Sequence, residues 1–118
     1  MYYTYIVRTD SGSLYTGITS DLFRRMKEHN EQGKKGAKYT RSQKIHSLEA
    51  LWSSPNRSTA SRLESAIKAL KKKEKELLVA KPEQFSTLFP KLEKEDFVYH
   101  PKANLDFYLK KIPLSRLS

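Results

Sequence analysis

Five residues of types that transfer protons or bind ions lie within the first 64 positions of the chain. Tyr5 and Tyr15 are ten residues apart, in two short runs separated by the turn-forming residues 9–13. If these runs pair as a hairpin, the two phenols lie close together on one face of a sheet. Arg25 and His29 are four residues apart, which makes them neighbours on a helix surface. Glu64 comes from a later segment, so only the fold can bring its carboxylate to the other four.

Each of these residues also has an ordinary structural explanation. Tyrosine is common in strands, and an arginine on a helix is exposed by default. Glu64 is followed four residues later by Lys68, which is the spacing of an everyday surface ion pair. Taken singly, each residue favours the ordinary explanation; that explanation weakens when the five are considered together.

Hydrophobic patterning predicts three strands in the first 80 residues. β-branched and aromatic residues fill positions 2–8 and 14–18, and the turn between them implies an antiparallel hairpin. Gly17, inside the second run, indicates a bulge or a close backbone approach. Alternation over 47–53 predicts a third strand, with Leu48 on the same face as Ala50 and Trp52.

Two helices are expected between and after these strands. The first is capped by Ser20 or Asp21. The second is a single long helix capped by Ser58 or Thr59, and the lysines within 71–75 end it near its negative C-terminal pole. The order β-β-α-β-α predicts an α+β domain: a small three-stranded antiparallel sheet flanked by helices.

Pro82 marks a predicted boundary between a domain and a C-terminal extension. Residues 1–80 are predicted to form one domain, and residues 81–118 a C-terminal extension with too few residues for a core of its own. The apolar residues within 85–109 are therefore expected to pack on the domain, on a protein partner or on a second copy.

Composition limits the class of partner. The formal net charge is +10 and the pI is about 9.8, which favours binding to phosphate polymers, although a basic pI alone also serves solubility. The sequence contains no run of 18 apolar residues, so it predicts no membrane span. Cysteine is absent, which excludes disulfides and thiolate metal sites and fits a cytoplasmic location.

The loop over residues 33–44 combines five basic residues with one tyrosine. Its side chains are expected to contact phosphates and to stack on a base or sugar, or else to form only a solvated basic loop. The candidate nucleic-acid-binding residues are Lys34, Lys35, Lys38, Tyr39, Arg41 and Lys44.

The chain resembles the GIY-YIG nuclease superfamily, and in particular its small single-domain bacterial members. The resemblance runs from Tyr2 to about Leu78. It is carried by Tyr3-Thr4-Tyr5, by Leu14-Tyr15-Thr16-Gly17-Ile18-Thr19, by Asp21-Leu22-Phe23-Arg24-Arg25 with His29, and by Arg62-Leu63-Glu64.

This resemblance implies a role for each of the five residues. Glu64 would hold one divalent cation, Mg²⁺ or Mn²⁺. Tyr5 would be the preferred general base, with a pKa lowered by its surroundings, and Tyr15 would orient water or phosphate. Arg25 would bind the scissile phosphate, and His29 would hydrogen-bond a tyrosine and relay its proton.

The activity implied by the resemblance is metal-dependent endonucleolytic hydrolysis of DNA, including structured or damaged DNA in repair or recombination, with RNA as another substrate. Two positions depart from the superfamily pattern. Ile18 stands where some members have a lysine, and Lys75-Glu76 lies where many have an asparagine. These departures support the alternative of a nucleic-acid-binding module with little or no catalysis.

Overall fold

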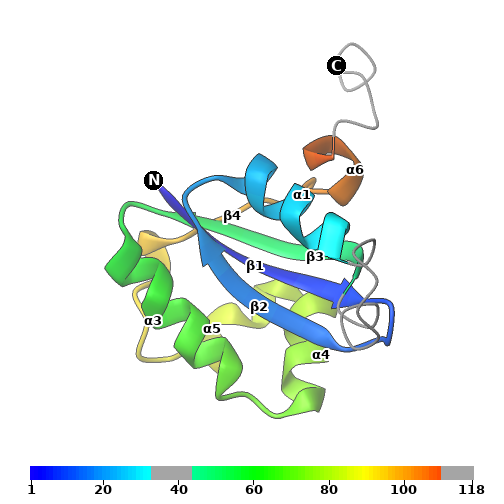
Figure 1. Cartoon of the computed structure of the whole chain (residues 1–118). Coiled ribbons are helices and arrows are strands. Elements are labelled where there is room, and N and C mark those ends of the chain that lie inside the picture. The colour runs from blue at the N-terminus through cyan, green and yellow to red at the C-terminus, as the bar shows by residue number, and fades with distance from the viewer. Residues whose placement is uncertain (33–43, 110–118) are drawn as a thin grey trace.

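The computed structural model describes residues 1–32 and 44–109, which form one antiparallel sheet with helices on both faces (Figure 1). The strands are β1 (Tyr2–Thr9), β2 (Leu14–Thr19), β3 (Ile45–Ser54) and β4 (Val98–Tyr99), in the order β2-β1-β3-β4. The expected α+β class and antiparallel sheet are confirmed. The structure adds β4 to the expected three strands, and this strand is too short for any sequence pattern to indicate it.

Helices α1 (Leu22–Gln32) and α6 (Leu105–Tyr108) lie on one side of the sheet (Figure 1). On the other side lie α3 (Arg57–Lys68), α4 (Lys72–Ala80) and α5 (Phe85–Leu88). Two short 3-10 turns, η1 (Pro82–Gln84) and η2 (Lys94–Asp96), flank α5 along the chain. Among the described residues, no helix has the length and apolar character that crossing a membrane requires.

The helix caps agree with the sequence for α1 and differ for α3. At the start of α1, the Asp21 side chain accepts from the backbone N–H of Arg24 at 3.1 Å. At the start of α3, the Asn56 side chain accepts from the N–H of Thr59 at 2.9 Å. The cap predicted at Ser58 or Thr59 is therefore wrong, because an Asn lies at the extended residue before the helix and fills this role first.

The single long helix predicted after β3 is also wrong, because the chain forms two helices there. Helix α3 ends at Lys68, and Lys71 adopts an extended backbone. The N–H of Lys71 donates to the Glu74 carboxylate at 2.8 Å, which starts α4. The lysines at 72, 73 and 75 thus lie at the beginning of α4, and Glu74 supplies the negative charge that this helix end favours.

A β-bulge in β3 changes the face of one predicted residue. Ile6 pairs with Ala50 and Val7 pairs with Leu48, so Glu49 has no partner position on β1. This extra residue reverses the alternation, and Leu48 packs with the α1 side of the sheet rather than with Trp52.

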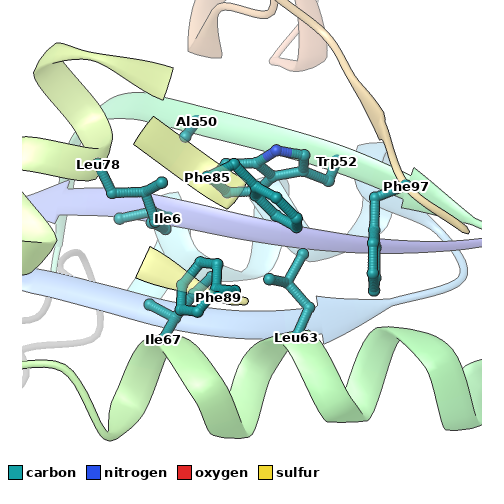
Figure 2. Close-up of a cluster of buried hydrophobic side chains, with 9 residues drawn as sticks. All are labelled: Ile6, Ala50, Trp52, Leu63, Ile67, Leu78, Phe85, Phe89 and Phe97. Carbon is teal, nitrogen blue, oxygen red and sulfur yellow. The ribbon is translucent and has the colours of Figure 1, made fainter. Parts of the chain in front are cut away.

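The sheet separates two hydrophobic clusters. The cluster toward α1 and α6 includes Tyr5, Met26 and Leu51. The cluster toward α3, α4 and α5 is larger, and its side chains come both from residues 1–80 and from the extension after them (Figure 2). Its buried members are Ile6, Ala50, Trp52, Leu63, Ile67, Leu78, Phe85, Phe89 and Phe97. Aromatic residues beyond position 82 are thus buried against residues 6–78.

Candidate active site

The hairpin places the Tyr5 ring directly over Gly17. The two residues are paired across β1 and β2, and a β-carbon added to Gly17 would overlap the Tyr5 hydroxyl and lie 2.6 Å from its Cζ. Real side chains do not tolerate such contacts, so only glycine admits the ring here. Of the two explanations that the sequence allows for Gly17, the close approach is the one observed.

Helix α1 brings two side chains to the Tyr5 hydroxyl. Nε2 of His29 lies 2.9 Å from this oxygen, and Nε of Arg25 donates to it at 3.1 Å. The spacing of four residues along α1 is what lets both side chains reach one atom. Because Arg25 donates to the oxygen, the phenol proton of Tyr5 is available to donate to His29.

Burial dominates the electrostatics of this group. It raises the pKa of the Tyr5 phenol; Arg25 lowers this pKa through its hydrogen bond and charge, while Tyr15 and Glu64 raise it further. The lowered Tyr5 pKa that the sequence analysis expects is therefore not observed. Burial and the Arg25 charge together lower the pKa of His29 to about 4, against the opposing charge of Glu28, so its imidazole is neutral at pH 7.

Tyr15 is the accessible phenol of the pair. Its ring centroid lies 6.5 Å from that of Tyr5 and 5.4 Å from that of His29. Tyr15 is 37% exposed, whereas Tyr5 is fully buried. Burial alone would lower the pKa of Arg25, but interactions with Tyr5 and Tyr15 outweigh it and raise that pKa. The guanidinium thus lies near both phenols and stays charged.

Glu64 reaches this group from α3. Its carboxylate is close enough to raise the pKa of Tyr5, and its Oε2 lies 3.4 Å from Nζ of Lys68. The described residues contain no group of three or more His, Cys, Asp or Glu side chains that could hold a metal ion. Magnesium is commonly held by one or two carboxylates, with waters and substrate phosphates completing its coordination. Glu64, as a single carboxylate near Tyr5, fits that kind of binding.

The predicted nucleic-acid-binding loop falls mostly outside the described residues. Lys34, Lys35, Lys38, Tyr39 and Arg41 are all outside them. Lys44 is half-buried just before β3, and its carbonyl accepts from the N–H of Asp10 at 2.8 Å. It therefore lies at the hairpin turn, beyond the end of β1 and not beside Tyr5.

Lys75-Glu76 lies where many members of the superfamily have an asparagine. In this chain, Glu76 makes an ion pair that the sequence does not indicate. Both Glu76 carboxylate oxygens accept from Arg8, at 2.7 and 3.1 Å, and Glu49 accepts from the same guanidinium at 2.6 Å. The hydrogen bond to Arg8 lowers the pKa of Glu76. Arg8 and Glu76 are 68 positions apart, so no local spacing could reveal the pair.

The fold is that of a nuclease domain. Residues 1–77 match the model of the GIY-YIG catalytic domain, and the chain belongs to this family of nucleases. A UPF0213 protein of Fusobacterium nucleatum is 44% identical over 71% of this chain and 82% of its own length. A UPF0213 protein of Yersinia pestis is 42% identical over 75% of this chain and 93% of its own length.

A solved structure is also similar to the chain. The solution NMR structure of a UPF0213 protein from Bacillus halodurans has 43% sequence identity and a TM-score of 0.44. The similarity covers 68% of this chain and 84% of that chain.

Proposed function

We propose that this chain is a divalent-metal-dependent endonuclease that hydrolyses phosphodiester bonds in DNA, with Tyr5, Tyr15, Arg25, His29 and Glu64 as its catalytic set. One observation carries the proposal: the Tyr5 hydroxyl is held by both Arg25 and His29, next to an exposed second phenol and a single carboxylate. A buried ionisable group with a perturbed pKa and specific charged partners, beside an accessible phenol, is a candidate functional site.

The two phenols have different tasks in this proposal. Tyr15 faces solvent, and its phenolate form is the one that contacts the attacking water and accepts its proton. Tyr5 is buried, with a raised pKa and its hydroxyl already engaged, so it positions Arg25 and His29 instead. This assignment replaces Tyr5 as the preferred base.

Arg25, and Glu64 through the cation that it would hold, together neutralise the charge of the phosphate. The guanidinium of Arg25 is about one-third exposed and can bind the scissile phosphate through its free N–H groups. Glu64 would hold one Mg²⁺ or Mn²⁺, which supplies charge neutralisation at the phosphate. Lys68 must then release the Glu64 carboxylate, which is a small cost because Lys68 is exposed and Glu64 partly exposed.

A second candidate function is nucleic-acid binding with little catalysis. The raised pKa of Tyr5 and the Glu64–Lys68 contact favour it, since both lower the readiness of the site for chemistry. Both functions use the same basic chain and the same substrate class, so only cleavage separates them.

The deciding experiment compares nicking of supercoiled plasmid by the wild-type chain, Glu64→Gln and Glu95→Gln, with and without Mn²⁺. Glu95 is exposed and belongs to none of the interactions above, so its substitution is the matched charge control. We expect Mn²⁺-dependent nicking by the wild type and by Glu95→Gln, and a loss of about a hundredfold or more in Glu64→Gln. Equal activity in all three, or none in any under saturating Mn²⁺, would refute catalysis at this site.

A further inference from the structure

A hollow lined by aromatic residues lies on the other face of the sheet from Tyr5. It has a volume of about 550 Å³, which is in the range of sites for small ligands. Trp52 from β3 supplies one wall, and Phe85, Phe97 and Tyr99 supply the others. Figure 2 shows three of these rings, those of Trp52, Phe85 and Phe97, on one side of the sheet.

The four rings form a connected series around the hollow. Ring centroids lie 5.6 Å apart between Tyr99 and Trp52, 6.1 Å between Trp52 and Phe85, and 5.6 Å between Phe85 and Phe97. All three pairs are tilted, with interplanar angles of 44° to 52°. Trp52, Phe85 and Phe97 are at most 9% exposed, so the half-buried Tyr99 offers the most accessible ring to a flat ligand.

Two charged residues of opposite sign stand at the edge of this surface. Lys94 is exposed and, within residues 1–32 and 44–109, its side chain has no ion pair or hydrogen bond. Glu83 lies close enough to Tyr99 to add to the effect of burial in raising the pKa of that phenol. A flat ligand in the hollow would therefore find a cation for an anionic group and an acceptor for an amino group.

We propose that this hollow binds an unpaired nucleotide, with its base against the Tyr99 ring and its phosphate at Lys94. Stacking of bases on aromatic side chains is tolerant of sequence because every base has a π-face. A base inside a duplex is already stacked and paired, so a single-stranded segment or a free mononucleotide is the ligand that fits. The nucleic-acid source of this nucleotide rests on the proposed nuclease function.

The hollow lies on the opposite face of the sheet from the catalytic cluster. Trp52 pairs across the sheet with Thr4, the residue next to Tyr5, so both sites lie at the same level along the strands. The outer strands β2 and β4 are three strand spacings apart, about 14 Å, and a nucleic-acid strand that meets both sites must also pass around an edge of the sheet. The rings at 85, 97 and 99 come after the family-domain match at 1–77, so the extension builds this feature.

The chain carries its own probe for this site, because Trp52 is its single tryptophan. We would titrate the full chain in EDTA, where a divalent-metal nuclease cannot cleave, and follow tryptophan fluorescence. The ligands are a short oligothymidylate, a blunt duplex of the same length, and thymidine monophosphate. We expect the single strand to quench Trp52 at concentrations about fivefold or more below the duplex. Quenching by the monophosphate at a similar concentration would identify free nucleotides as the source, and quenching by the strand alone would identify the substrate.

Variants separate stacking and local charge from general attraction. Tyr99→Leu and Lys94→Gln should each weaken the single-strand titration about fivefold or more, whereas Lys91→Gln, an exposed lysine outside the hollow, should change it less than about twofold. The proposal is overturned if no nucleic acid quenches Trp52, which would point to a different class of ligand. It is equally overturned if Lys91→Gln and Lys94→Gln weaken binding alike, or if Tyr99→Leu has no effect.

The same titration with Glu64→Gln keeps the two proposals apart. This variant should retain Trp52 quenching, because the carboxylate is not part of the hollow. Normal quenching with no nicking in the wild type would remove catalysis alone, and normal nicking without quenching would remove the nucleotide site alone.

Discussion

The hydroxyl of Tyr5 lies 2.9 Å from Nε2 of His29, in a part of the protein where both side chains are almost completely buried. This contact joins β1 to α1 and fixes the geometry that the proposed catalytic set requires. It also makes the cluster sensitive to changes in volume, hydrogen bonding and protonation, and three of the predictions below follow from it.

Gly17→Ala should disrupt the cluster from the strand side. The added methyl group overlaps the Tyr5 hydroxyl and must displace the ring, at a cost of about 1–3 kcal/mol in the free energy of unfolding. Nicking should fall together with stability, because the contact between Tyr5 and His29 cannot survive the shift. Urea denaturation and the plasmid assay measure the two effects.

Gly12→Ala is the control for that change. Gly12 has a φ of 88° at the hairpin turn and open space around it, so alanine there strains only the backbone. It should lower stability without changing activity per folded molecule. If Gly17→Ala behaved in the same way, the close approach would have no role in the site.

Tyr5→Phe and Tyr15→Phe should differ in their effect on stability. Removing the buried hydroxyl of Tyr5 leaves Nε2 of His29 without its partner, which should cost roughly 1–3 kcal/mol in the free energy of unfolding. Tyr15 is partly exposed, so its change should cost well under about 1 kcal/mol but abolish most nicking. Thermal unfolding and initial rates measure both; full activity in Tyr15→Phe would reject it as the base.

The low pKa of His29 predicts a loss of stability in mild acid. The unfolded chain takes up a proton near pH 6.5, whereas the folded imidazole, with a pKa of about 4, resists it. The contribution is complete above pH 6.5 and is lost as the pH falls toward 4, by roughly 3 kcal/mol in total. Wild type and His29→Gln should therefore differ most at neutral pH and converge near pH 4. Parallel curves of unfolding free energy against pH would contradict this.

Arg8→Met should weaken the join between the hairpin and α4. The guanidinium binds the carboxylates of Glu49 and Glu76, and without it two acidic groups face each other. The pair is partly exposed, so we expect a loss of only about 1 kcal/mol, smaller at high salt where charges are screened. Urea denaturation at low and high NaCl measures it, and nicking per folded molecule should not change. An effect independent of salt would assign the loss to packing and not to charge.

Local sequence patterns were sufficient to predict β1, β2 and α1, which carry most of the site. The runs around Tyr5 and Tyr15 became β1 and β2, the Arg25–His29 spacing became a helix face, and the α+β class followed from their order. Period and turn chemistry act over a few residues, and that is why they can be read along the chain. The errors at Leu48 and at the break between α3 and α4 have the same origin, since a bulge and a competing cap outweigh periodicity.

By itself the sequence determined the family, the three longer strands and helix α1, and which five side chains are candidates for chemistry. Only the tertiary structure decided how those side chains differ. Burial under α1 made Tyr5 a poor base and left Tyr15 accessible, and the packing of the extension on β3 created the aromatic hollow. Exposure and pKa depend on what surrounds a residue in three dimensions, and the neighbours that set them here lie up to tens of positions away along the chain.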